Sequence, residues 1–97
     1  MATAQKIVDD ITAHVGGDRY SSWYAGIASD PEDCLFKRHK VSRKHGRWIY
    51  RKADTNQVAR NAEDALHRSG FDGGPGGGDA KTKSVYAYKK TLSTSED

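Results

Sequence analysis

The sequence predicts a small α+β domain in which a three-stranded β-sheet is flanked by about three helices. Its 97 residues suffice for one domain with one thin core. Segments with helical spacing of apolar residues alternate with short segments rich in aromatic and β-branched residues. Two Trp, five Tyr and two Phe argue against wholesale disorder, although 30% of the residues are charged.

The N-terminal part is predicted to be a helix over 4–15 followed by a strand within SSWYAGIAS, residues 21–29. The helix has one apolar stripe, formed by Ile7, Ile11 and Val15. Gly16 and Gly17 supply the left-handed stop that helices favour. Gly26 inside the strand predicts a bend, or a group that approaches the backbone closely.

A second helix is predicted over 31–40 and a second strand over 47–53. Asp30 is placed to cap this helix, and Pro31 occupies its first position. The strand should place Trp48 and Tyr50 on one side and Ile49 on the other.

The C-terminal part is predicted to contain a third helix, a loop and the last strand. Asp54 or Thr55 caps the helix, and Gly70 ends it. Its inward stripe is Val58, Ala62, Ala65 and Leu66, and Phe71 should fold back over its last turn. A flexible glycine-rich loop over 72–83 leads to a strand with the sequence SVYAYKKT. Residues 1–92 are expected to form one domain, with 93–97 as a disordered acidic tail.

Charge is distributed unevenly along the chain. Residues 1–33 carry two basic and six acidic side chains, residues 34–53 carry eight basic and none acidic, and residues 54–97 carry six and seven. The middle segment is a basic block with interleaved aromatic residues, a pattern typical of proteins that contact phosphates. We therefore expect DNA or RNA as the partner, with an acidic protein surface as the alternative. The candidate contact residues are Lys37, Lys40, Arg43, Lys44, Arg47 and Arg51.

The stretch from Tyr24 to His39 reads YAGIASDPEDCLFKRH. Its tyrosine-containing strand and capped helix resemble the second half of a GIY-YIG endonuclease domain, over roughly residues 22 to 70. The resemblance implies a three-stranded sheet flanked by helices and a metal-dependent phosphodiester site. It also implies that Tyr24 positions or deprotonates a water, that Arg38 or His39 stabilises the phosphate, and that Glu63 holds Mg²⁺.

Each of these side chains also has a purely structural interpretation. Tyr24 would then pack on the sheet, and His39 would interact with the dipole at the end of its helix. Glu63 would be a solvated partner of Arg60 or His67.

Two departures from the family pattern bear on catalysis. No Gly-Ile-Tyr strand precedes Tyr24. The helix arginine is also missing: counting forward from Tyr24 puts Cys34 at its position, and counting back four residues from His39 puts Leu35 there. A guanidinium offers planar paired donors to phosphoryl oxygens, so its loss predicts weakened catalysis. Arg38 lies one helical turn beyond Cys34 and is the candidate replacement.

These observations predict a nucleic-acid-binding domain on a GIY-YIG-like scaffold whose catalysis is degenerate. The alternatives are a protein-interaction domain and an active Mg²⁺-dependent endonuclease. No apolar run approaches the roughly 18 residues of a membrane span, and the N-terminal residues lack the features of a signal peptide. The single cysteine suits a reducing compartment, so a cytoplasmic location without membrane contact is expected.

Overall fold

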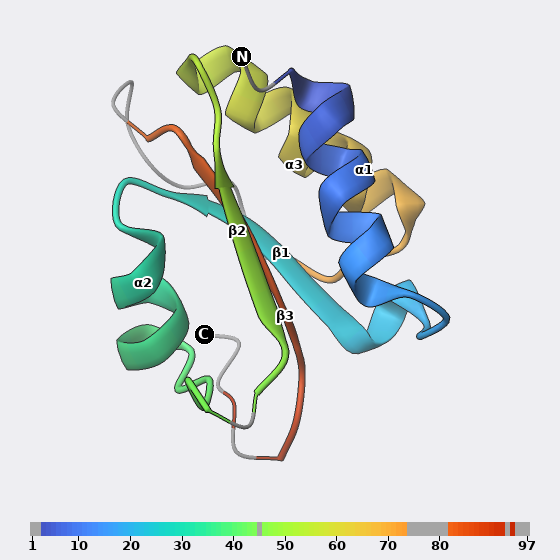
Figure 1. The fold of residues 1–97 in the computed structure, drawn as a ribbon, viewed down its shortest axis with the longest axis vertical. Coiled ribbons are helices and arrows are strands. Elements are labelled where there is room, and N and C mark those ends of the chain that lie inside the picture. The colour runs from blue at the N-terminus through green and yellow to red at the C-terminus, as the bar shows by residue number, and fades with distance from the viewer. Residues whose placement is uncertain (1–2, 45, 74–81, 93, 95–97) are drawn as a thin grey trace.

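The computed structural model describes residues 3–44, 46–73, 82–92 and 94. The elements in chain order are α1 (Ala4–Val15), β1 (Trp23–Ala28), α2 (Pro31–Asp33), β2 (Trp48–Lys52), α3 (Asn56–Ser69) and β3 (Ser84–Lys89). A 3₁₀ turn (Tyr20–Ser22) precedes β1, and a π-helical segment (Cys34–Arg38) continues α2. The predicted α+β class is confirmed, with a three-stranded antiparallel sheet and three helices (Figure 1). Most of the predicted glycine-rich loop and of the acidic tail lies outside the described residues.

The last strand of the chain, β3, occupies the centre of the sheet, whose order is β1-β3-β2. Both neighbours pair with β3 in antiparallel register: Tyr24 lies opposite Tyr88 and Gly26 opposite Tyr86. On the other side of β3, Trp48 is also opposite Tyr88. The outer edge of β1 is covered in part, because Ala25 and Asp72 are joined through a backbone hydrogen bond of 2.9 Å.

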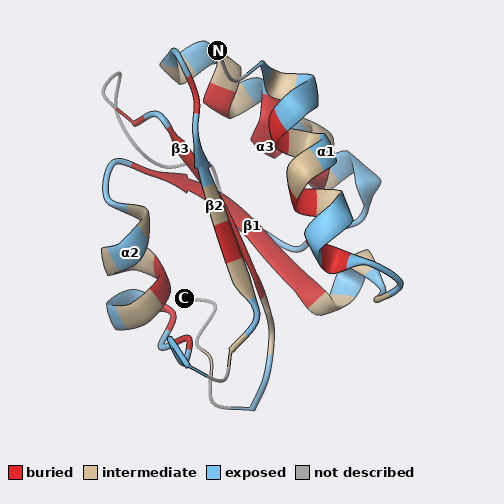
Figure 2. Ribbon diagram, in the orientation of Figure 1, coloured by how far each residue is buried: buried red, intermediate tan, exposed pale blue. Residues whose placement is uncertain are grey.

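Helices α1 and α3 cover one face of the sheet, and α2 with the π-helical segment covers the other (Figure 1). The first face holds the larger core, to which α1 contributes Ile7, Ile11 and Val15 as predicted. Buried residues extend along β1 and along the inward sides of α1 and α3 (Figure 2). The second face holds a smaller cluster in which tyrosine side chains take much of the space that aliphatic side chains fill on the first.

The helix ends follow the capping chemistry predicted from the sequence. The side chain of Asp30 accepts a hydrogen bond from the backbone N–H of Asp33 at 3.1 Å, and Thr55 caps α3 in the same way. Gly16 and Gly70 end α1 and α3 with φ angles of 67° and 121°, which favour glycine. Phe71 folds back as predicted and is 4% exposed.

The helix predicted over 31–40 is a turn of α-helix followed by π-helix. The N–H of His39 donates to the carbonyl of Cys34 at 2.9 Å, a five-residue spacing. Both Leu35 and His39 face the sheet and are buried. Lys40 ends the segment with a φ of 57°, a conformation uncommon for residues other than glycine.

Candidate functional site

A cluster of tyrosine and histidine rings occupies the sheet face beneath α2. The register of β1 and β3 brings Tyr24 to Tyr88, with ring centroids 5.3 Å apart and planes 24° from parallel. The ring of Tyr86 lies 6.4 Å from that of Tyr24. His39 lies 4.8 Å from Tyr24, centroid to centroid, so β1, β3 and the end of the π-helical segment all contribute to one cluster.

His39 links two of these tyrosines through both of its ring nitrogens. Nε2 lies 2.8 Å from the Tyr86 hydroxyl, and Nδ1 lies 3.1 Å from the Tyr88 hydroxyl. The imidazole is 4% exposed. An interaction with the helix dipole therefore does not fully describe His39, because its side chain is buried in a polar network.

Gly26 makes this arrangement possible. A Cβ at this position would lie 2.7 Å from the Tyr86 hydroxyl oxygen and 2.9 Å from the ring carbon that carries it. The close approach predicted from the glycine is thus confirmed, and the approaching group is the Tyr86 ring. The absence of a side chain at Gly26 lets this ring lie against β1.

The hydroxyl of Tyr86 contacts His39 and lies within electrostatic reach of side chains from other elements. Burial raises the pKa of Tyr86 well above its ordinary value, and the neighbouring Tyr24, Cys34 and Glu63 raise it further. The positive charge of Arg38 acts in the opposite direction. Tyr86 is therefore a neutral phenol that can donate and accept hydrogen bonds.

Glu63 projects from α3 and is buried, with 9% of its surface exposed. Burial raises its pKa above 4.5, while the charges of His67 and Arg60 partly offset that effect. The prediction that Glu63 is solvated is therefore wrong, although Arg60 and His67 do act on it. The Nε2 of His67 lies 2.9 Å from the Ala25 carbonyl, which ties α3 to β1 beside the site.

The residues present are compatible with one kind of metal binding. Among the described residues, no group of three or more His, Cys, Asp or Glu side chains is arranged to enclose a metal ion. Mg²⁺, however, is usually held by one or two carboxylates together with waters and substrate phosphates. Glu63 fits that role as a single buried oxygen ligand, whose raised pKa reflects a charge left without full solvation.

Arg38 lies on the solvent side of the cluster, next to Cys34. Burial raises the pKa of the Cys34 thiol, and the charge and hydrogen bond of Arg38 lower it. Both residues line an open pocket of about 280 Å³ at the end of β1. Arg38 thus lies near Cys34, and its side chain is exposed.

The predicted basic contact surface is divided between the two faces of the sheet. Arg47 and Arg51 project toward α1, where Arg47 pairs with Asp18 at 2.5 Å and Arg51 with Asp10 at 3.2 Å. Arg47 also donates to the His14 carbonyl at 3.0 Å. These two arginines connect β2 to α1 and its following turn, away from the tyrosine cluster.

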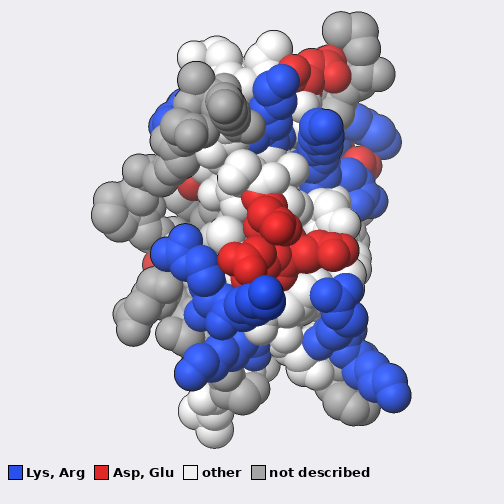
Figure 3. All heavy atoms as spheres, turned by 90° about the vertical axis from the view of Figure 1, so that its left-hand side faces the viewer, with Lys and Arg blue, Asp and Glu red and all other residues white. Residues whose placement is uncertain are grey.

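The other four predicted contact residues lie on the α2 side. Lys37 pairs with Asp33 at 3.5 Å, and Arg43 lies 4.0 Å from Glu32. Lys40 and Lys44 are exposed and form no ion pair within the described part of the chain. Figure 3 shows basic side chains on this face around a central group of acidic ones.

Tyr86 and Tyr88 were not among the residues selected from the sequence. Alternation in SVYAYKKT does place both on one face of a strand. Nothing in that local pattern places the strand beside Tyr24, since the pairing depends on register across more than half the chain.

Comparisons with protein families, curated proteins and solved structures found no match to this chain. Within the described ranges, no helix has the length and apolar character required to cross a membrane.

Proposed function

We propose that this chain is a nucleic-acid-binding domain on a GIY-YIG-like scaffold, with a phosphodiester site that has lost most of its catalytic power. One observation carries the proposal: His39 contacts the hydroxyl group of Tyr86, and the other side chains selected through the family resemblance lie within electrostatic reach of it. His39 contacts it at 2.8 Å, and the charges of Arg38 and Glu63 both act on its pKa, as does Tyr24. Four separate segments of the chain supply these groups.

The position of β3 supports the GIY-YIG-like interpretation. In that family a second tyrosine-bearing strand is expected beside the strand of Tyr24, and none precedes it here. In the fold, β3 lies beside β1 in antiparallel register and places Tyr86 opposite Gly26. A tyrosine strand is thus present in space, although it comes later in the chain.

The groups of the site suit the binding of a phosphodiester and its attacking water. Tyr24 and the neutral phenol of Tyr86 would position a water, and His39 would accept a proton through Tyr86. Glu63 would hold Mg²⁺, which supplies charge stabilisation at the phosphate when bound. Arg38 would contribute positive charge at the rim of the site.

The same geometry is the reason we expect catalysis to be weak. Cys34 or Leu35, depending on the direction of counting, takes the position where the family pattern expects an arginine, and of the two Cys34 lies close enough to affect the Tyr86 hydroxyl. A neutral thiol provides no positive charge and no paired donors for the phosphoryl oxygens. Arg38 approaches from solvent, where its effect is screened.

Binding is tested by titrating labelled single- and double-stranded DNA and RNA at several salt concentrations. We expect affinity to fall steeply with salt, and Lys44→Ala to reduce the slope of log K against log salt by about 1. Arg51→Ala is the matched control, because Arg51 lies on the α1 side and should leave that slope unchanged. Absence of binding at low salt would refute the proposal and leave a protein partner for the basic surface.

Catalysis is tested by restoring the missing group. Cys34→Arg should produce Mg²⁺-dependent nicking that exceeds the cleavage by the unmodified chain, and adding Glu63→Ala should abolish it. Equal cleavage by the unmodified chain and by Cys34→Arg would refute the idea that position 34 limits the reaction. Rapid cleavage by the unmodified chain that is lost in Arg38→Ala would instead identify an active endonuclease.

A further inference from the structure

Three half-buried aromatic side chains lie on the α2 side, at the outer margin of the tyrosine cluster: Phe36, Trp48 and Tyr50. Trp48 and Tyr50 project from the same face of β2, with ring centroids 6.2 Å apart and planes 10° from parallel. Phe36 meets Trp48 edge to face at 4.9 Å. We call these three residues the aromatic strip.

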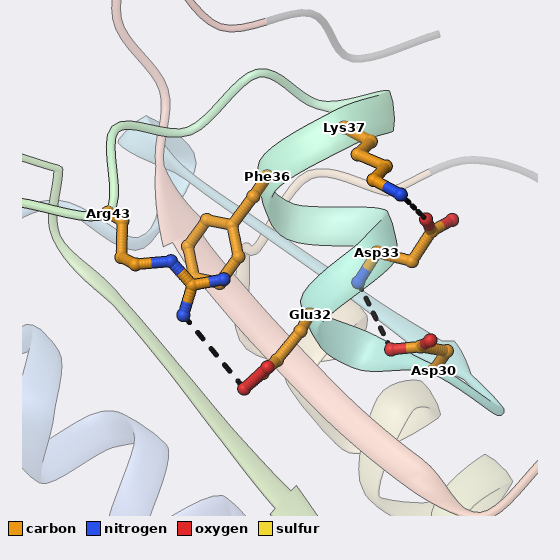
Figure 4. Close-up of a pocket in the computed structure, with 6 residues that line it drawn as sticks. All are labelled: Asp30, Glu32, Asp33, Phe36, Lys37 and Arg43. Carbon is orange, nitrogen blue, oxygen red and sulfur yellow. Dashed lines mark hydrogen bonds and ion pairs between the residues drawn. The ribbon is translucent and has the colours of Figure 1, made fainter.

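Arg43 holds one end of the aromatic strip in place. Its guanidinium carbon lies 3.9 Å from the centre of the Phe36 ring, and its backbone carbonyl accepts a hydrogen bond from Trp48 Nε1 at 3.3 Å. Phe36 and Arg43 line a pocket of about 210 Å³, into which Glu32 also projects (Figure 4). A flat ring and a flat guanidinium are the two side-chain groups on which nucleobases stack.

The charges around the aromatic strip favour bases over phosphates at its centre. Asp30, Glu32 and Asp33 line the pocket, and their carboxylates would repel a phosphate placed there. Lys40 and Lys44 are exposed and lie on either side of Arg43 in the chain, where they can meet a phosphate backbone. A duplex presents its phosphates outward, whereas a single strand can turn its bases toward the protein.

We propose that the aromatic strip binds unpaired bases, and that the partner of this domain is single-stranded nucleic acid. Bases stack on Phe36, Trp48 and Tyr50, while the phosphates run past the exposed lysines. This inference rests on the proposed function and gives it a substrate class.

Tryptophan fluorescence tests the stacking directly. The chain has two tryptophans, of which Trp23 is fully buried and Trp48 is half-buried. A single-stranded oligonucleotide should quench Trp48 and bind at least about tenfold more tightly than an abasic strand of the same length and charge. It should also bind more tightly than the corresponding duplex at equal salt.

A variant pair separates stacking from general damage to the fold. Phe36→Leu keeps apolar contact but removes the ring, and should weaken single-strand binding by about tenfold while leaving abasic-strand binding unchanged. Tyr20→Leu is the control, since Tyr20 is half-buried and stacked on Phe71 near the start of β1, outside the aromatic strip. It should leave single-strand affinity unchanged.

The outcomes distinguish this inference from the proposed function. Equal affinity for normal and abasic strands, or tightest binding to duplex, would overturn the stacking inference and leave salt-dependent nucleic-acid binding intact. Equal loss of affinity in Phe36→Leu and Tyr20→Leu would overturn it as well. Failure of every strand to bind at low salt would refute both.

Discussion

Replacing Gly26 by alanine should destabilise the domain by about 1–3 kcal/mol, the usual cost of overpacking a filled core. The new Cβ would lie 2.7 Å from the hydroxyl oxygen of Tyr86 and 2.9 Å from the adjoining ring carbon. Ordinary contact begins at 3.4 Å, so the ring must move by roughly half an ångström or more. Tyr86 is 4% exposed and held by His39 at 2.8 Å, so it has little room to move.

The loss should be measured by urea denaturation and by thermal melting followed by circular dichroism. A change of 1 kcal/mol shifts the melting temperature of a domain of this size by about 4–8 °C, so the decrease should be readily resolved. In Gly26→Ala combined with Tyr86→Phe, the nearest clashing atom is absent. The two substitutions should therefore cost less together than the sum of their separate effects.

Gly17→Ala provides the matched control. A Cβ at Gly17 would meet nothing within 4 Å, and this substitution should leave stability unchanged or raise it slightly. The reasoning would be refuted if Gly26→Ala were as well tolerated as Gly17→Ala. It would also fail if the effects of Gly26→Ala and Tyr86→Phe were simply additive.

Glu63→Gln should stabilise the domain by an amount that grows with pH. Burial raises the pKa of Glu63, so the contribution of this residue to stability is full below pH 4.5 and is lost as the pH rises through the raised pKa. The urea midpoints of the variant and of the unmodified chain should therefore diverge with pH. A difference between them that is the same at every pH would contradict this. Asp30→Ala should lower the free energy of unfolding by about 1 kcal/mol, because it removes the hydrogen bond to the Asp33 backbone. An unchanged melting temperature would contradict this. Thr55→Ala should cost a similar amount by uncapping α3, and amide hydrogen exchange should rise first at its N-terminal turn.

Local chemistry made the elements predictable from the sequence. The apolar stripe of α1, the cap at Asp30 and the glycine that ends α3 all depend on residues within a few positions of one another. The replacement of α-helix by π-helix after Asp33 was not predictable in that way. It follows from tertiary packing, since both Leu35 and His39 are buried against the sheet.

The candidate site was predictable only in part, because long-range strand pairing assembles it. Tyr24, Arg38, His39 and Glu63 could be selected from motif order, but Tyr86 could not, since its place opposite Gly26 depends on β3 entering the centre of the sheet. Nothing in a single sequence specifies that strand order.

The prediction of one basic contact surface could have been refined by strand periodicity. Arg47, just before β2, and Ile49 and Arg51 within it alternate with Trp48 and Tyr50, so the two arginines share the face of the buried Ile49. The summed charge of residues 34–53 does not reveal that its basic side chains are divided between the two faces of the sheet. The exposed lysines outside the strand remain the better candidates for phosphate contact.

The central position of β3 also determines when the sheet can form. The paired residues are separated by between 32 positions, for Lys52 and Ser84, and 66 positions, for Trp23 and Lys89. During synthesis β1 and β2 emerge first and have no strand to pair with until Ser84–Lys89 follows. Such non-local pairing slows folding and leaves strand edges open to aggregation in the meantime. A ribosome-bound chain stopped before residue 84 should therefore have helices but no protected sheet amides, and protection should appear once β3 is released.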